Sequence, residues 1–232
     1  MRRPRISDER GFSLPELLVA MVIGMVVLLA AFMVLDRSFT ASGQIADRTE
    51  ALQRGRIAMN LITRQLRSQV CVGATKVPVA AGSDTSVSFY ADLSDGSTPI
   101  RLRTLTFNPT TDTITESVVT GAGTYPNLTF TSPPTTKPLL TKVKQIMDGS
   151  TARPIFRYYG YVTGTTDGSL VQLLPASPLS SANLSRVAVI NIGFRAFADR
   201  SLVNDKDSAV LEDDVYVRVA SPTNPQDGPA CF

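Results

Sequence analysis

An unbroken apolar run occupies residues 17–35 and contains no charged side chain. About 20 apolar helical residues span the roughly 30 Å hydrocarbon core of a bilayer, so this run predicts a transmembrane helix. Residues 1–11, which come before it, carry four arginines against Asp8 and Glu9. Under the positive-inside rule, we expect residues 1–11 to stay in the cytoplasm. The chain after the run is then expected to lie outside the cytoplasmic membrane.

Two other interpretations of the apolar run remain open, a cleaved secretory signal peptide and an ordinary uncleaved signal anchor. A signal peptide has a shorter apolar region followed by small residues at the cut site. Here the run is followed by Asp36 and Arg37, with no such site. Neither interpretation explains Glu16, because a carboxylate costs roughly 2–3 kcal/mol near the bilayer centre and less near its edge. Glu16 therefore calls for a positively charged partner.

The helical pattern continues beyond the apolar run, and we expect one helix over residues 12–70. Apolar residues spaced by seven, together with neighbours on the same 3.6-residue period, form a stripe: Phe39, Ile45, Leu52, Met59, Ile62, Leu66 and Val70. Most arginines fall elsewhere, as on a solvated face: Arg37, Arg48, Arg54, Arg56, Arg64 and Arg67. We interpret the stripe as surface that packs on the protein's own domain. A coiled coil with another chain and a DNA-binding arginine face are the alternatives.

Glycines interrupt this helical pattern at Gly43 and Gly55. Each costs roughly 1 kcal/mol relative to alanine in a helix, so both are expected to be weak points where the helix bends.

After Gly73 the composition changes to Thr, Ser, Gly and Pro with short apolar or alternating runs, which predict strands. We expect strands at residues 87–93, 100–107, 113–119, 155–162, 170–174, 187–197 and 215–219. The segment 139–147 fits either a short helix or a strand, and the prolines at 133–134 and 175–178 mark loops. The predicted fold class is α+β, with one long N-terminal helix, half transmembrane and half amphipathic, packed on a largely antiparallel sheet.

The composition excludes several classes of enzyme. The 232-residue chain has no histidine, which excludes Ser-His-Asp and Cys-His catalysis and HExxH zinc sites. It contains no P-loop and no GxGxxG motif. We therefore expect no enzymatic activity, no catalytic residue and no cofactor. The net charge of +3 is too small to imply a nucleic-acid partner.

Cys71 and Cys231 are the only cysteines, and their separation excludes zinc ribbons and CxxC redox motifs. Outside the cytoplasm, an even pair of cysteines predicts a disulfide. The alternative is two unpaired thiols, one of them buried and the other in a loose tail.

Two further clusters contain residue types that occur in binding sites. Acidic residues gather near the C-terminus, among them Asp205, Asp207, Asp213 and Asp214. Calcium takes six to eight oxygen ligands, but the spacing does not match an EF-hand, so we expect a solvated loop, with calcium binding as the weaker alternative. Aromatic rings at Phe156, Tyr158, Tyr159 and Tyr161 share one predicted strand, on which alternate rings face the core. A stacking platform for sugar or DNA is the alternative for these rings.

The segment at residues 11–19, GFSLPELLV, resembles the class III signal of type IV pilins and pseudopilins. The resemblance implies that prepilin peptidase cuts between Gly11 and Phe12 and methylates the new N-terminus, Phe12. It implies that the apolar helix becomes the core of a helical filament, with Glu16 as the assembly glutamate. The amino group of Phe12 on one subunit would then pair with Glu16 on its neighbour. The family more commonly has an aliphatic residue where Pro15 stands, but proline in the first helical turn loses no hydrogen bond.

This resemblance divides the chain into four parts. They are a cytoplasmic leader peptide at 1–11, a transmembrane and filament-core helix at 12–35, an amphipathic continuation at 36–71 and a β-rich extracytoplasmic domain at 72–232. The layout most resembles the PilW-type minor pilins or the J-type minor pseudopilins of type II secretion. Three features carry that likeness: the large ectodomain, the arginine-rich segment LQRGRIAMNLITRQLRSQ, and the strand FRYY followed later by LSRVAVINIGF.

We therefore expect a structural or assembly subunit of a pilus, a type II secretion system or a competence apparatus for DNA uptake. Its expected partners are prepilin peptidase, other pilins or pseudopilins in a helical filament, and the cytoplasmic membrane. The alternative is a membrane-anchored adhesin or DNA-binding receptor that uses its ectodomain.

Overall fold

The structure, a computed structural model, describes residues 13–92, 100–163, 168–173, 178–199, 207–218, 220 and 231. The chain divides into two compact units, residues 1–46 and 47–232. One helix, α1 (Leu14–Arg67), begins in the first unit and ends in the second. It agrees with the long helix predicted from the sequence, although it ends three residues before the predicted Val70. Glu16 in its first turn and the basic residues Arg64 and Arg67 in its last turn both complement the helix dipole.

The apolar stripe predicted along α1 is buried only toward the C-terminal end of the helix. The buried residues of α1 begin at Ala51 and include Met59, Ile62 and Leu66. Phe39 and Ile45 were predicted to belong to the same stripe, but their side chains are 75% and 68% exposed. The heptad spacing was therefore a correct guide to packing only within the second unit.

The first sheet is an antiparallel meander in which each strand pairs with the next along the chain. Its strands are β1 (Val79–Gly82), β2 (Ser86–Ala91), β3 (Arg101–Asn108), β4 (Thr113–Thr120) and β5 (Thr135–Thr141). Alternate side chains of each strand face the core. In β2, Val87 and Phe89 are completely buried, while the neighbouring residues on the other face are half-buried. Asp112, between β3 and β4, has a φ of 50°, in the left-handed region that Asp tolerates in turns.

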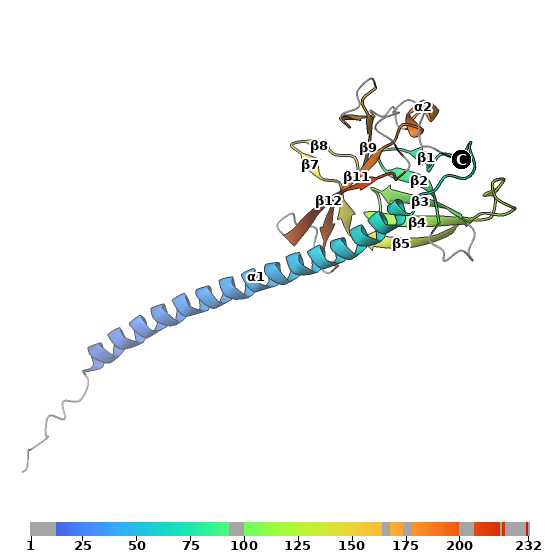
Figure 1. Ribbon diagram of the computed structural model, residues 1–232. Helices are drawn as coiled ribbons and strands as arrows, with labels where there is room; N and C mark the ends of the chain where they lie inside the picture. Colours follow the sequence, from blue (N-terminus) through green and yellow to red (C-terminus); the bar gives the residue numbers. More distant parts are fainter. Residues whose placement is uncertain are drawn as a thin grey trace, which may run out of the picture. The chain divides into compact units, whose positions relative to one another are not determined.

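The second sheet is also antiparallel and has the order β10-β9-β11-β12, with β6 pairing to β11 beside β9. Its strands are β6 (Val143–Lys144), β9 (Phe156–Tyr161), β10 (Leu170–Gln172), β11 (Val189–Phe197) and β12 (Ser208–Tyr216). A small hairpin of β7 (Met147–Asp148) and β8 (Thr151–Ala152) and the short helix α2 (Ser181–Leu184) complete the described elements. Figure 1 shows these elements along the chain.

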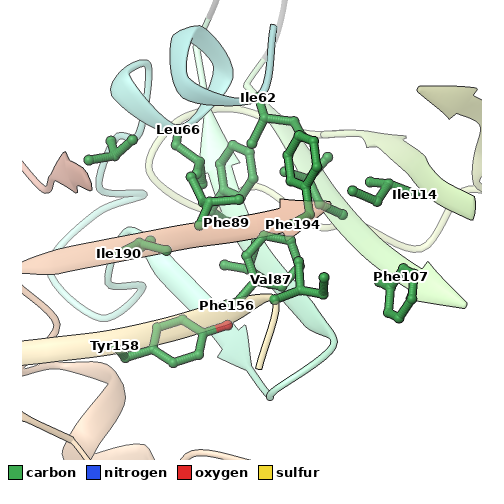
Figure 2. Close-up of a cluster of buried hydrophobic side chains, with 14 of the residues drawn as sticks. Ile62, Leu66, Val87, Phe89, Phe107, Ile114, Phe156, Tyr158, Ile190 and Phe194 are labelled. Atoms are coloured by element: carbon green, nitrogen blue, oxygen red, sulfur yellow. The ribbon is translucent and has the colours of Figure 1, made fainter. Parts of the chain in front are cut away.

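One hydrophobic core joins the second unit's part of α1 to both sheets. Ile62 and Leu66 of α1 contribute to the same cluster as Phe89 of the first sheet and Phe194 of the second. Figure 2 shows these four side chains gathered beside Val87, Phe156 and Ile190. The fold is thus α+β, a long helix packed on antiparallel sheets, as in the pilin-like architecture.

Most predicted strands are present to within about two residues, and the ambiguous segment 139–147 is extended, at β5, β6 and β7. The last predicted strand, at 215–219, was misplaced, because the observed strand is β12, residues 208–216. Its acidic residues had suggested a loop. The short strands β1 and β8 and the helix α2 were not predicted, since each is only two to four residues long.

Candidate functional site

Glu16 lies in the first turn of α1, and no other charged residue occurs between Leu14 and Leu35. The turn is closed by the carbonyl of Ser13, which accepts hydrogen bonds from the N–H of Glu16 at 3.0 Å and of Leu17 at 3.2 Å. The Glu16 side chain is exposed at the positive end of the helix dipole, which favours a carboxylate there. The two other predicted residues of this site, Gly11 and Phe12, lie outside the described residues.

The apolar side chains around and after Glu16 are strongly exposed. Every large apolar residue of α1 from Leu14 to Leu35 has between 50% and 77% of its surface accessible. Exposed apolar area costs about 25 cal/mol per Å² in water, so a surface of this size requires lipid or another apolar surface. Within the part of the chain that the structure describes, α1 is the one helix long and apolar enough to cross a membrane. This length and composition fit a single-pass membrane anchor.

Small residues allow the second unit's part of α1 to lie close to the second sheet. Ala51, Gly55 and Ala58 are buried on one side of the helix. A Cβ built on Gly55 would be 2.5 Å from Leu211 Cδ1 and 3.1 Å from Ala196 Cβ, whereas at Gly43 nothing lies within 4 Å. Gly55 was predicted to be a weak point of the helix. In the structure it is instead a point of close contact, which no larger side chain would permit without movement.

Arg54 was predicted to lie on a solvated face, but it joins α1 to both sheets. Its Nη1 donates to the carbonyl of Phe197 at 3.3 Å and lies 3.5 Å from Asp199 Oδ1, while its Nη2 donates to Thr141 Oγ1 at 2.9 Å. Only 25% of the side chain is exposed. The next turn toward the N-terminus adds a bond, because Glu50 Oε1 accepts from the N–H of Asp199 at 3.1 Å.

Cys71 and Cys231 form a disulfide in the structure, with their Cα atoms 5.5 Å apart and a sequence separation of 160. Two backbone hydrogen bonds hold the segment before Cys71 against the end of β2, from Val70 N–H to the Tyr90 carbonyl at 2.9 Å and from Asp92 N–H to the Ser68 carbonyl at 3.1 Å. The disulfide therefore joins the segment that follows α1 to a residue near the C-terminus.

Asp213 and Asp214, which were predicted to lie in a solvated loop, are part of β12. Asp213 and Asp214 are consecutive on this strand, opposite Ile192 and Asn191 of β11. Their side chains therefore point to opposite faces of the sheet. Asp207 is buried just before β12, and Asp205 lies outside the described residues. Among the described residues no three acidic or cysteine side chains gather as a metal site, and calcium binding stays a prediction.

A polar network explains why acidic residues occur on β12. Arg157 of β9 donates from Nη2 to Asn191 Oδ1 at 2.7 Å and also pairs with Glu212 Oε1. Arg153 Nη2 donates to the same Glu212 oxygen at 2.9 Å, and Asn191 Nδ2 donates to Asp214 Oδ1 at 2.6 Å. Arg157, Asn191 and Asp214 lie in one row across β9, β11 and β12, and Glu212 is two residues before Asp214 on the same face of β12. The carboxylates therefore stabilise the pairing of neighbouring strands.

A buried ion pair on the inner face of the first sheet was not found from the sequence. Glu116 of β4 is completely buried, and its Oε1 pairs with Nη1 of Arg103 on β3. Its Oε2 lies 3.0 Å from Lys137 Nζ, whose side chain is 58% exposed. The signal was present, because Arg103 and Glu116 each occupy an inward position of an alternating strand beside Leu105 and Ile114.

The aromatic strand β9 divides as expected between two faces. Phe156 and Tyr158 are buried in the core, whereas Tyr159 and Tyr161 are half-buried on the opposite face. The Tyr158 hydroxyl donates to the carbonyl of Ser86 at 2.8 Å, which connects the two sheets. Burial raises the pKa of Tyr158 far above its ordinary value, because the ionised phenolate would lose its hydration.

Comparison with known proteins gives a match at the N-terminus. Residues 6–32 match the family model described as the prokaryotic N-terminal methylation motif. The match includes Gly11, Phe12 and Glu16, and it ends within the apolar part of α1. None of the curated proteins matches the chain. The motif, the apolar helix and the α+β fold together support a type IV pilin-like protein, a structural rather than an enzymatic kind.

Proposed function

We propose that this protein is a minor pilin or pseudopilin, a structural or assembly subunit of a type IV pilus-like filament. The observation that carries the proposal is the methylation motif at residues 6–32, which overlaps an exposed apolar helix. A secretory signal peptide has no need of a carboxylate in its apolar region. A filament subunit uses one, because Glu16 can pair with a cation that appears only after processing.

The proposal assigns each part of the chain to one side of the cytoplasmic membrane or to the membrane itself. Residues 1–11 form a basic leader on the cytoplasmic side, which prepilin peptidase removes by cutting between Gly11 and Phe12. Residues 12–35 store the subunit in the membrane, and the domain from residue 72 onward lies outside the cytoplasm. The Cys71–Cys231 disulfide supports this orientation, since disulfides persist in oxidising compartments.

Assembly then exchanges one apolar environment for another. The apolar surface of α1 leaves lipid when the corresponding helices of neighbouring subunits replace the lipid contacts. Removal of the leader leaves a positively charged amine on Phe12, and its methylation does not remove that charge. Pairing of this amine with Glu16 of a neighbour stabilises a carboxylate that would otherwise be costly in an apolar setting.

The filament that we propose belongs to one of three kinds of system: a pilus, a type II secretion system or a competence apparatus. The large ectodomain favours a subunit present in few copies over a major one. Its surface differs from that of α1, because its apolar side chains are mostly buried in a core that α1 shares with both sheets. The ectodomain is therefore expected to fold fully before its helix leaves the membrane.

The N-terminus of the protein purified from cells tests the proposal. We expect mass spectrometry to find a mature chain that begins with methylated Phe12. The variant Gly11→Val should remain at full length, while Ser13→Ala, a change two residues away and outside the cut bond, should be processed normally. A wild-type protein that still carries residues 1–11 would contradict the proposal.

A further inference from the structure

A cleft with a volume of about 440 Å³ opens beside the last turns of α1, within the second unit. Three segments far apart in sequence line it. The end of α1 contributes most of the lining, Asp92 follows β2, and Arg218 follows β12; the α1 residues and the residue after them are Asn60, Thr63, Arg64, Arg67 and Ser68. All of these residues are described, and the hydrogen bond from Asp92 N–H to the Ser68 carbonyl fixes two of the three segments together.

Three arginines line this cleft without a partner of their own among the described residues. Arg64, Arg67 and Arg218 are exposed and form no hydrogen bond or ion pair within the part of the chain that the structure describes. By contrast, Arg103 is paired with a buried carboxylate, and the guanidinium of Arg157 binds both Asn191 and Glu212. The three side chains line the same cleft, although Arg218 is about 150 positions from Arg64 and Arg67 in sequence.

The helix dipole does not account for all three charges. Basic side chains in a last helical turn stabilise the helix, which is sufficient reason for Arg64 and Arg67 to be there. Arg218 is not on the helix, and it adds a third positive charge where like charges repel. Among the described lining residues Asp92 is the one carboxylate, so the described side chains of the cleft, three guanidiniums and one carboxylate, have a net charge of +2.

The other polar groups of the cleft do not supply an internal counter-ion. The hydroxyl of Thr63 donates to the Asn60 carbonyl at 3.3 Å, and the hydroxyl of Ser68 donates to the Gln65 carbonyl at 2.7 Å. Their protons are therefore used within the helix. The guanidinium N–H groups and the Asn60 amide are the remaining donors, which suits a ligand made of acceptor oxygens.

We propose that this cleft binds a phosphate monoester, a dianionic phosphate group carried on a sugar-sized body. A phosphate monoester has a charge of about −1.5 to −2 at pH 7, which matches the cleft better than the single charge of a carboxylate. The volume lies within the range of about 300–1,000 Å³ that small-molecule sites occupy, so it has room for more than a bare phosphate ion. The site does not involve Glu16 or filament assembly.

Isothermal titration calorimetry on the mature full-length chain, in an uncharged detergent at low ionic strength, tests this site. The probes are glucose 6-phosphate, inorganic phosphate, glucose and acetate. We expect glucose 6-phosphate to bind, glucose not to bind, and acetate to bind at least about tenfold more weakly. Inorganic phosphate that binds as tightly as glucose 6-phosphate would retain the phosphate recognition but overturn the role of the attached body.

The variants Arg67→Gln and Arg218→Gln should each weaken the binding of glucose 6-phosphate at least about tenfold. Arg56→Gln is the matched control, because Arg56 is an exposed arginine of the same helix that does not line the cleft. Unchanged far-UV circular dichroism establishes that the variants fold. Equal weakening by all three variants, no binding at millimolar concentration, or tighter arginine-dependent binding of duplex DNA would each overturn the proposal.

Discussion

Gly55 of α1 lies so close to Leu211 of β12 that a Cβ at position 55 would be 2.5 Å from Leu211 Cδ1. The same Cβ would be 3.1 Å from the Cβ of Ala196 on β11, which cannot rotate out of the contact. The leucine alone could move, but the alanine is fixed to the backbone of a central strand. The absence of a side chain at Gly55 thus sets how closely the helix approaches the second sheet.

Gly55→Val should therefore destabilise the folded domain. Overpacking of a well-packed contact costs about 1–3 kcal/mol, more than the helix gains when glycine is replaced. The free energy of unfolding is measured by urea denaturation of the mature chain in detergent, followed by circular dichroism. Gly43→Val is the matched control, because nothing lies within 4 Å of a Cβ there, and it should change stability by less than about 0.5 kcal/mol. Equal effects of the two substitutions would refute the contact.

Glu116→Gln should be strongly destabilising, because it leaves the guanidinium of Arg103 buried without a counter-charge. Removal of one partner of a buried ion pair typically costs about 3–5 kcal/mol. The double variant Arg103→Met/Glu116→Leu removes both charges and should recover most of that loss, since apolar replacements of buried pairs are often neutral or stabilising. Urea denaturation of the three proteins measures the difference. A single variant as stable as the wild type would show that the pair is not needed.

The sequence was sufficient to predict helices and strands whose apolar residues follow a regular local pattern. The apolar run predicted the exposed part of α1, and strict alternation predicted β3 and β4. The same alternation places Arg103 and Glu116 on the inner face, although their pairing requires the register between two strands. In each of these cases the local pattern and the tertiary structure favour the same conformation.

The predictions from sequence were wrong where contacts between residues far apart in the chain determine the local structure. The acidic residues of β12 are typical of a loop when the sequence is considered locally. In the structure Glu212 is neutralised by Arg153 and Arg157, which are more than 50 positions earlier. Gly55 is locally unfavourable in a helix, and only its close contact with Leu211 in the folded domain explains it. The heptad stripe includes Ile45, but the described part of the domain covers only the later turns of the helix. A repeating apolar pattern does not show which of its repeats will pack against another part of the protein.

Tyr158 should make the domain sensitive to alkaline pH. The folded state raises the pKa of its hydroxyl above the ordinary value of 10.0, so only the unfolded chain ionises there as the pH rises. The stabilisation is complete below pH 10 and is progressively lost above it. Tyr158→Phe should lose about 1 kcal/mol at pH 7, because its hydrogen bond to the Ser86 carbonyl is removed. Its stability should then fall less steeply than that of the wild type between pH 10 and pH 11, measured by urea denaturation at each pH.

Loss of the disulfide should weaken the domain in a manner that reductant can reproduce. Cys231→Ser is expected to cost about 2–5 kcal/mol, because the bond closes a very long loop in the unfolded chain. Reduction of the wild type should give a similar loss, whereas the variant should not respond to reductant. Urea denaturation with and without dithiothreitol measures both effects. Alkylation of the wild-type cysteines without prior reduction would show that the thiols are free in the purified protein.

Glu16→Ala should separate processing from assembly. Glu16 follows the proposed cut site by five residues, so the variant should still be cut and methylated. It should nevertheless be lost from the filament, since the charged amine of Phe12 on the neighbouring subunit would have no carboxylate to pair with inside an apolar core. Asp36→Ala is the matched control, because Asp36 is the next carboxylate along the same helix and follows the apolar run. Mass spectrometry of the N-terminus reports processing, and immunoblotting of sheared filaments reports incorporation. A Glu16→Ala subunit that enters filaments as the wild type does would remove the electrostatic role, whereas a defect shared with Asp36→Ala would point to a general loss of helix charge.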